Sequence, residues 1–378
     1  MRPAGAPLPG DGPSGAGSGP TEAGADDESR LRVVFVLAGV ELFGGVKVVL
    51  QLADLLRGRG HRVVVAAPAP APSWYSLGAD YLELPALEAE HLPAADLYVG
   101  TFYTTLAPAR DAASARGATA VHLCQGFEGA LSHNRGEHPL IDQAYRLPLP
   151  ALTVSEHLTR LIEERFRRPA RRIRQPVDPA FRPLLPRRER PTSPARILIT
   201  GAWEFYLKGV DVALAAVRRL RREGLECQVV RLSQWPLCDA ERKLEPSSEF
   251  HHHLRPSEVP ELLRGCDLLL APSWPVEGFG LPVLEAFASG VPVVASDIPS
   301  FREFAAPAAA LLPHDDEAGF AREAARLLRD PQHWRSRRDA GLAVAADYGP
   351  DAAAEALVAG LRWARSTTTR RDPAPVGD

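Results

Sequence analysis

Two carboxylates that stand eight positions apart are the residues most suited to chemistry in this chain. Glu277 and Glu285 lie in the stretch SWPVEGFGLPVLEAFASG, which runs from Ser273 to Gly290. The first sits in a glycine-rich segment and the second in an apolar one. The run DLLLAPS that leads into this stretch is typical of a buried strand, so Glu277 follows a strand end, where α/β proteins bind their ligands.

The second glutamate is predicted to lie on a short helix. Pro282 suits a first helical turn, and Gly290 would end the helix. One carboxylate would then grip vicinal hydroxyls from the helix, and the other would meet hydroxyls from the loop. The alternative is two unrelated solvent-exposed acids, which the combination of spacing, glycines and strand end disfavours. Free N–H groups at the start of this helix would hold a phosphate between the two carboxylates. They belong to Phe279, Gly280 and Leu281.

Two further segments suit a phosphate. AGVELFGGVK leads from a predicted strand into a predicted helix, and Gly44 and Gly45 would let the backbone approach a ligand. A tight turn with no ligand is the alternative there. Lys208 and Gly209 open a helix in the second half, where the alternative is a solvated surface lysine. A dinucleotide site is disfavoured, because the first loop is not G-x-G-x-x-G and no acidic residue follows the second strand.

The elements that must position these residues alternate between strand and helix twice along the chain. Apolar runs such as LRVVFVLAG and HRVVVAAP alternate with helical spacing in the first half, and a second series starts at ARILITGA. Between them, residues 165–190 hold ten arginines and five prolines. That composition predicts a solvated interdomain connector. The fold class is therefore α/β, with two Rossmann-like, doubly wound parallel-sheet domains that face a cleft.

The predicted boundaries follow from these shifts in composition. Residues 1–30, with seven glycines and five prolines, form a disordered N-terminal extension. The N-terminal domain, on the acceptor side, spans 31–181, and the linker spans 182–195. The C-terminal domain, on the donor side, spans 196–350, and a C-terminal helix and tail span 351–378.

Composition excludes several classes of function. A net charge of -3 gives no general attraction to nucleic acid. The four cysteines are scattered, which fits a reducing cytosol and argues against a disulfide framework or a thiolate zinc site. A run of three histidines in FHHHLRPSE invites a metal site, but strand alternation would put only His251 and His253 on one face. Two surface histidines at a strand end are the favoured interpretation, and no metal site is predicted.

Several of these segments together resemble one protein family. EGFGLPVLEA resembles the E-x7-E signature of the retaining GT-B glycosyltransferases of family 4. GGVKVVLQLADLLRGRGHRVVV resembles that family's glycine loop and first helix. VSEHLTRLI and QPVDPAFRP resemble the end of its N-terminal domain, and GVPVVASDIPSFREF resembles the segment after the signature. The likeness covers nearly all of the chain after residue 30 and specifies the family far better than the sugar.

The resemblance implies a role for each matching residue. Glu285 would hydrogen-bond the nucleotide ribose, and Glu277 would contact the donor sugar. Lys208 would neutralise the leaving diphosphate, and His122 would sit near the reacting sugar, with a buried structural histidine as the alternative. The family's usual arginine is replaced by Ala202, so its two-cation clamp is incomplete. The backbone that approaches the diphosphate or sugar would come from Gly44, Gly45, Gly278, Phe279, Gly280 and Leu281.

The implied reaction is the retaining, metal-independent transfer of a sugar from a nucleotide-diphosphate sugar. The acceptor would be a carbohydrate, lipid-linked or natural-product molecule, and the nucleotide sugar would be a co-substrate with no further cofactor. The alternative is a non-transferring nucleotide-sugar-binding protein, or an epimerase, of the same fold. The expected location is the cytoplasm, with weak peripheral contact at the inner face of the membrane and no nucleic-acid partner.

Overall fold

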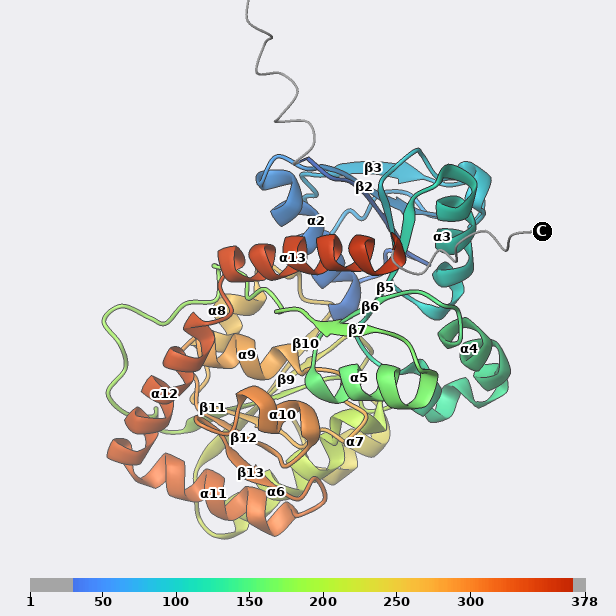
Figure 1. Ribbon diagram of the computed structural model, residues 1–378. Helices are drawn as coiled ribbons and strands as arrows, with labels where there is room; N and C mark the ends of the chain where they lie inside the picture. Colours follow the sequence, from blue (N-terminus) through green and yellow to red (C-terminus); the bar gives the residue numbers. More distant parts are fainter. Residues whose placement is uncertain (1–29, 370–378) are drawn as a thin grey trace, which may run out of the picture.

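A computed structural model describes residues 30–369 of the chain and contains two α/β units (Figure 1). The predicted extension over 1–30 lies outside the described residues except for Arg30, as does the end of the predicted tail beyond Thr369. Each unit is built around one parallel sheet with helices on both faces, which confirms the predicted fold class. The exact domain boundaries stay predictions.

The first sheet has seven parallel strands in the order β3-β2-β1-β4-β5-β6-β7. Its central strands are almost wholly apolar because helices cover both faces, and Phe35, Val65 and Val99 are fully buried. The strand order reverses beside β1, so the loops after β1 and β4 diverge and leave a crevice. The strands are β1 (Arg32–Val36), β2 (Arg62–Ala67), β3 (Asp80–Glu83), β4 (Leu97–Gly100), β5 (Thr119–Cys124), β6 (Ala151–Thr153) and β7 (Ala170–Arg172).

The second sheet has six parallel strands in the order β10-β9-β8-β11-β12-β13. It reverses between β8 and β11, so the loop that carries Glu277 and the loop that carries Lys208 come from neighbouring strands. The strands are β8 (Ala195–Thr200), β9 (Cys227–Ser233), β10 (Glu249–His252), β11 (Leu268–Ala271), β12 (Val293–Ser296) and β13 (Ala310–Leu312).

The helices include several that the sequence pattern does not predict. α3 is one of them, because it contains Pro108 and lacks a clear apolar stripe. The helices of the first unit are α2 (Gly44–Gly58), α3 (Tyr103–Arg116), α4 (His138–Tyr145) and α5 (Glu156–Arg160). Those after the linker are α6 (Val210–Arg222), α7 (Asp239–Leu244), α8 (Val259–Arg264), α9 (Leu281–Ala288), α10 (Pro299–Phe304), α11 (Glu317–Arg329), α12 (Pro331–Ala346) and α13 (Pro350–Thr369).

The last helix returns to the first unit. Figure 1 shows α13 crossing beside α2 and the strands β5 and β6, which it contacts. Leu357, Leu361 and Ala364 are fully buried in the core around β1 and α2. Because the chain crosses the domain boundary at both the linker and α13, two covalent connections limit how the units move.

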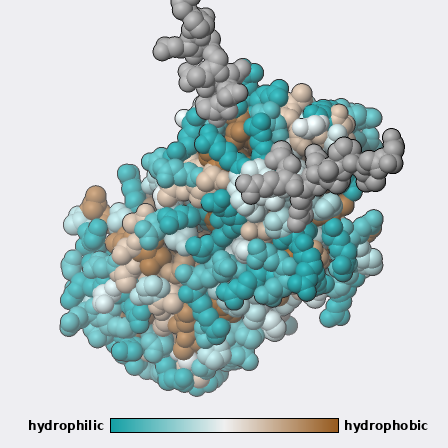
Figure 2. Space-filling model, in the orientation of Figure 1, coloured by the Kyte–Doolittle hydropathy of each residue, from teal (hydrophilic) through white to brown (hydrophobic). Residues whose placement is uncertain are grey.

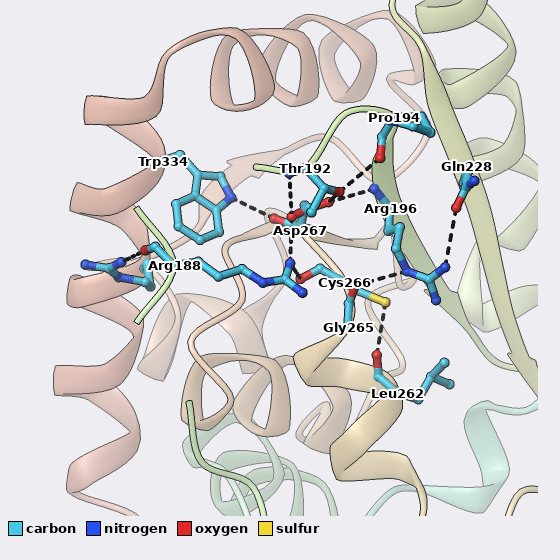
Figure 3. Close-up of polar contacts among 11 residues, drawn as sticks. Arg188, Thr192, Pro194, Arg196, Gln228, Leu262, Gly265, Cys266, Asp267 and Trp334 are labelled. Atoms are coloured by element: carbon cyan, nitrogen blue, oxygen red, sulfur yellow. Dashed lines mark hydrogen bonds and ion pairs between the residues drawn. The ribbon is translucent and has the colours of Figure 1, made fainter. Parts of the chain in front are cut away.

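The linker is anchored to the second unit by one buried carboxylate (Figure 3). Asp267 is fully buried and its oxygens accept from Arg188 Nη1 at 2.8 Å, from Thr192 N and Oγ1, and from Arg196 N. Trp334 Nε1 donates to the Asp267 carbonyl at 2.8 Å, which ties α12 to the same point. The segment that joins the units is therefore hydrogen-bonded to the start of β11.

The arginine-rich stretch is not the uniformly solvated connector that its composition predicts. It contributes β7 to the first sheet, and Arg168 is 3% exposed. This guanidinium donates to the carbonyls of Leu149 and Tyr145 at 2.8 Å each. Burial lowers the pKa of Arg168 to about 10. A buried charge is tolerated here because backbone oxygens replace part of its hydration.

The two units also meet at the start of α5. Ser155 occupies the predicted N-cap position, but its hydroxyl makes no hydrogen bond among the described residues. The carboxylate of Glu303 on α10 instead accepts from the amides of Glu156 and His157 at 2.8 and 3.0 Å. A carboxylate from the second unit therefore caps a helix of the first and complements its dipole.

The surface in Figure 2 is mostly hydrophilic, with scattered apolar patches. Leu185, in the linker, is 85% exposed. Within residues 30–369, every helix is too short or too polar to cross a membrane. The four cysteines are free, and three of them are buried.

Candidate active site between the two sheets

A cavity of about 510 Å³ lies between the two units at the carboxyl ends of their strands. Its walls come from β8, from the loops that follow β1, β5, β8, β9, β10 and β11, from α8, and from the starts of α2 and α9. Such a volume is typical of a small-ligand site. It brings together most of the residues predicted from sequence. These are Gly44, Gly45, Lys208, Glu277, Phe279, Gly280, Leu281 and Glu285.

Glu285 is paired with a lysine from the opposite unit. Lys47 Nζ lies 3.0 Å from Glu285 Oε1, and both side chains are less than a fifth exposed. Lys47 also lies over the ring of Phe181, 4.9 Å from its centroid. Because Lys47 is on α2 and Glu285 on α9, this ion pair spans the cleft.

Glu277 is paired with the other lysine of the cavity. Lys208 Nζ lies 2.5 Å from Glu277 Oε2, and the two side chains are 26% and 12% exposed. The stem of Lys208 packs against Gly201, where a Cβ would lie 2.7 Å from Lys208 Cγ. The absence of a side chain at Gly201, which has φ 110°, therefore leaves the space that the stem of Lys208 occupies.

The glycines around Glu277 permit two close approaches. A Cβ at Gly278 would lie 2.0 Å from the carbonyl oxygen of Gln125, which belongs to the opposite unit. Gly280, the N-cap of α9, has φ 95°, and a Cβ there would lie 2.2 Å from the Phe301 ring. Gly278 therefore determines how closely the two units meet, a role that the sequence pattern does not reveal.

Replacing Gly278 by alanine is expected to lower kcat/KM for the glycosyl transfer proposed below by about tenfold or more. The new methyl group would push the Glu277 loop away from Gln125, and a displacement near 1 Å can cost about 10²-fold in rate. Gly136→Ala is the matched control, because nothing lies within 4 Å of a Cβ at that position. Equal activity of both variants in steady-state kinetics would contradict the packing role.

A buried ion pair supports the loop that carries Ala202. Arg231 is fully buried and its Nε lies 2.5 Å from Glu241 Oε1. Its other nitrogens donate to the carbonyls of Ile199 and Gly201 at 2.6 and 2.8 Å. Ala202 itself is 1% exposed at the cavity wall. Ala202 thus places only a methyl group where the family has an arginine, and the hydrogen bonds from Arg231 hold the backbone just before it.

His122 is not at the cleft, which corrects its predicted place near the reacting sugar. It is 1% exposed and lines neither described cavity. Its Nδ1 lies 3.4 Å from Arg168 Nη1, and its ring packs edge-on against Tyr145. Burial and the neighbouring arginine hold the pKa of His122 well below its usual value, so the ring stays neutral. The strand runs past His122 and ends at Cys124, so Gln125 reaches the cavity instead.

Several cavity residues were missed by sequence reasoning. Lys47 is the last residue of the segment AGVELFGGVK, two positions after Gly45, and this spacing was available as a signal. Gln125 directly follows β5, and its Nε2 donates to the Gly45 carbonyl at 3.1 Å. His253 lies beyond the end of β10 with φ 52°, so strand alternation no longer applies and its side chain lines the cavity. His251 instead lies 2.5 Å from Glu249.

A second cavity of about 480 Å³ adjoins the first and is lined by the N-terminal unit and by Val276 of the second unit. The two share Phe43, Gly45, Gln125 and Leu131 as lining residues. Glu128 also lines it, and accepts a short hydrogen bond from the Tyr145 hydroxyl. Burial raises the pKa of Glu128 to about 7.

Comparison with known proteins places the second unit in a family. The family model of the glycosyl transferases group 1 matches residues 194–330, which contain β8 to β13. Residues 194–330 are therefore similar to the group 1 glycosyl transferases, and this matching segment is called the group 1 domain below. The match includes Lys208, Glu277 and Glu285. The group 1 domain therefore supplies three of the four ion-paired residues of the cleft, and the N-terminal unit supplies Lys47.

Curated relatives match about a third of the chain. It is 40% identical over 133 residues to glycogen synthase of Mycobacterium tuberculosis, covering 33% of this chain and 31% of that protein. It is 30% identical over 144 residues to phosphatidyl-myo-inositol mannosyltransferase of Mycolicibacterium smegmatis, covering 36% of each. The chain thus matches about a third of the length of each of these relatives.

A solved structure is similar to this chain across both units. Anabaena Alr3699/HepE in complex with UDP-glucose superposes with a TM-score of 0.70 at 14% identity, covering 90% of this chain and all of that one. At this identity the likeness establishes the fold. The chain has the GT-B fold, with the group 1 domain as its second unit.

Proposed function

We propose that the protein transfers a sugar, with retention of anomeric configuration, from a nucleotide-diphosphate sugar to an acceptor hydroxyl. One observation carries this proposal: the cleft brings two carboxylates, two lysines and helix-start glycines from both units into one cavity. Carboxylates suit sugar and ribose hydroxyls, and lysines with helix N–H groups suit a diphosphate. The relatives named for sugar transfer and the UDP-glucose complex of HepE support the same reading. The acceptor is a carbohydrate, lipid-linked or natural-product molecule.

The donor occupies the larger cavity. Glu285 accepts from the ribose hydroxyls, and Glu277 accepts from hydroxyls of the sugar. The diphosphate lies between them against the amides that start α9 and α2. Lys47 supplies the second cation that Ala202 does not, because it is the partner of Glu285 across the cleft and lines the same cavity as Lys208. Both lysines exchange a carboxylate partner for phosphate oxygens when the donor binds.

The transfer step needs no nucleophile from the protein. The acceptor oxygen forms its bond to the anomeric carbon on the face from which the diphosphate leaves, as the bond from that carbon to the diphosphate oxygen breaks. The acceptor proton passes to the departing diphosphate. Lys47, Lys208 and the helix-start amides stabilise the negative charge that develops on the leaving group. The proposed reaction uses no metal and no further cofactor.

A binding protein or an epimerase of the same fold is the alternative. Its support in the sequence is the missing arginine at Ala202. Lys47 weakens that support, because a second cation reaches the cleft from the other unit.

The proposal is tested by screening UDP-, GDP- and dTDP-sugars for thermal stabilisation, followed by measurement of nucleotide diphosphate release. A ligand that binds the folded state raises stability by RT ln(1 + [L]/Kd). Stabilisation with acceptor-dependent release supports transfer. Stabilisation with no release from any donor, with or without acceptor, supports the binding-protein alternative.

The two glutamates are expected to act on different parts of the donor. Glu285→Gln weakens charge-assisted bonds to the ribose, each worth about 1.5–3 kcal/mol, so nucleotide diphosphate and nucleotide sugar should lose affinity alike. Glu277→Gln should leave diphosphate affinity within about twofold, because the sugar is the part of the donor that Glu277 contacts, and should lower kcat or donor preference. Calorimetric titration compares both with Glu317→Gln, an exposed control on α11. Equal loss of diphosphate affinity in both cleft variants would refute this division.

A further inference from the structure

The second cavity opens at the strand ends of the N-terminal sheet. Its walls come from the loops after β1, β4 and β5, with Val276 of the group 1 domain on the facing side. It joins the donor cavity at Gly45 and Gln125, which line both. A molecule bound in this cavity, whose volume is about 480 Å³, would lie next to the donor.

The walls of this cavity are apolar. Most of the side chains that face it are aliphatic or aromatic, which favours a ligand with an apolar ring or chain. They are Leu37, Phe43, Val46, Val49, Phe102, Phe127, Leu131 and Val276.

The ionisable side chains that line the cavity among the described residues are both acidic, and Glu128, whose pKa is raised to about 7, is fully charged only above neutral pH. Glu41 and Glu128 line it, and among the described residues no lysine, arginine or histidine does. The nearby cation Arg165 stacks on the Phe127 ring at 4.8 Å and lies 3.8 Å from Asp142, without lining the cavity. A phosphate placed here would face carboxylates with no cation to pair with, at a cost in binding.

The amides at the start of α3 do not compensate for the missing cations. Those of Thr101 and Phe102 donate to Thr105 Oγ1 at 2.9 and 3.1 Å, so they are occupied within the protein. The proposed function assigns the amides at the start of α2 to the donor diphosphate.

Glu128 provides a hydrogen-bond acceptor at the polar end of the cavity. Its carboxylate is held by the Tyr145 hydroxyl, and Cys124 Sγ lies 3.8 Å from that hydroxyl. Gln125 lies beside it at the junction of the two cavities. A neutral hydroxyl can donate to Glu128 or Gln125, whereas an ionised phosphate cannot.

From these observations we infer that the second cavity binds the acceptor, and that this acceptor is an uncharged, hydroxyl-bearing molecule with an apolar body. The inference rests on the proposed function and narrows its acceptor class. It separates this chain from its relative named for phosphatidyl-myo-inositol, a molecule that carries a phosphate.

The test uses two fluorescent probes that share one apolar ring system. The full chain is first saturated with the nucleotide diphosphate identified by the screen, so that the phosphate-binding donor cavity is filled. It is then titrated with 4-methylumbelliferyl β-D-glucoside, which is neutral, and with 4-methylumbelliferyl phosphate. The glucoside is expected to bind about tenfold more tightly than the phosphate, or better, because only the phosphate meets like charge. Equal affinity, tighter binding of the phosphate, or no binding of the glucoside would overturn the inference.

Variants that change the charge of the lining test whether the preference for the neutral probe arises in this cavity. Leu131→Lys places a cation at the shared wall and should lower the affinity ratio of glucoside to phosphate by about tenfold, and Glu128→Gln should lower it in the same direction. Leu185→Lys is the control, because Leu185 is exposed and remote from the lining. An unchanged ratio in both cavity variants would overturn the location.

Donor turnover separates this inference from the proposed function. Release of nucleotide diphosphate that the phosphate probe stimulates and the glucoside does not would overturn the inference and leave glycosyl transfer intact. Tight glucoside binding by a chain that binds no nucleotide sugar would support the cavity chemistry and overturn the proposed function.

Discussion

Lys208→Ala is expected to lower kcat/KM for the transfer by about 10²- to 10³-fold, the largest effect on activity of any single change proposed. The removal of one preorganised electrostatic contact to a developing anion costs about this much. The stem of Lys208 is held against Gly201 and its ammonium lies at the cavity wall, so its charge is already placed before the donor arrives. Folding should be retained, because the side chain is partly exposed. Steady-state kinetics with the donor from the screen measures the effect.

Two further variants test whether the loss of activity is due to the position of Lys208 in the cavity. Lys243→Ala removes an exposed lysine from α7 and should leave kcat/KM unchanged. Lys208→Ala also leaves Glu277 without its 2.5 Å partner. The double variant Lys208→Ala/Glu277→Gln removes that unpaired charge, and should be as slow as the single variant or slower if the lysine acts on the diphosphate, because Glu277 also contacts the donor sugar. Recovery of activity in the double variant would mean that Lys208 serves only to neutralise Glu277.

Asp267→Ala is expected to lower the free energy of unfolding by about 3–5 kcal/mol, the range measured when one partner of a buried ion pair is removed. The change leaves Arg188 without its ion pair and leaves Thr192 N, Thr192 Oγ1 and Arg196 N without an acceptor (Figure 3). The linker then loses its attachment to the start of β11. Urea unfolding followed by far-ultraviolet circular dichroism measures the loss.

The control for this prediction is Asp315→Ala, which removes an exposed carboxylate from the same domain and should change the free energy of unfolding by less than about 0.5 kcal/mol. Asp267→Asn is a milder test, because it keeps one oxygen for a backbone donor but loses the negative charge that pairs with Arg188. It should fall between the wild type and Asp267→Ala. Equal stability of Asp267→Ala and the control would contradict the anchoring role.

The fold could be predicted from sequence because its signals are local. Buried parallel strands such as β1 and β11 have apolar sequences, and helices such as α2 and α6 carry a regular apolar stripe. Elements that lack such signals were missed, as with α3, whose stripe is weak and which contains Pro108. The short strand β7 was missed because it lies in an arginine-rich stretch, and only pairing with β6 makes it a strand.

Some residues of the candidate site could likewise be predicted from local sequence, and others could not. Glu277, Glu285 and Lys208 could be predicted because each lies at a strand end or helix start, positions that a local pattern reveals. His122 was misplaced because the pattern does not fix the residue at which a strand ends. One or two residues decide whether a side chain enters the cleft, as Gln125 does, or the core.

By itself the sequence determined the two alternating α/β units and the positions of the chemically active loops, because periodicity and turn residues act over a few positions. Tertiary structure decided which groups from different units meet. Lys47 reaches Glu285 across 238 positions of sequence, and Gly278 packs against the backbone of Gln125. Glu303 caps a helix 147 positions away. Such contacts depend on how two folded surfaces pack together, and no local pattern encodes that packing.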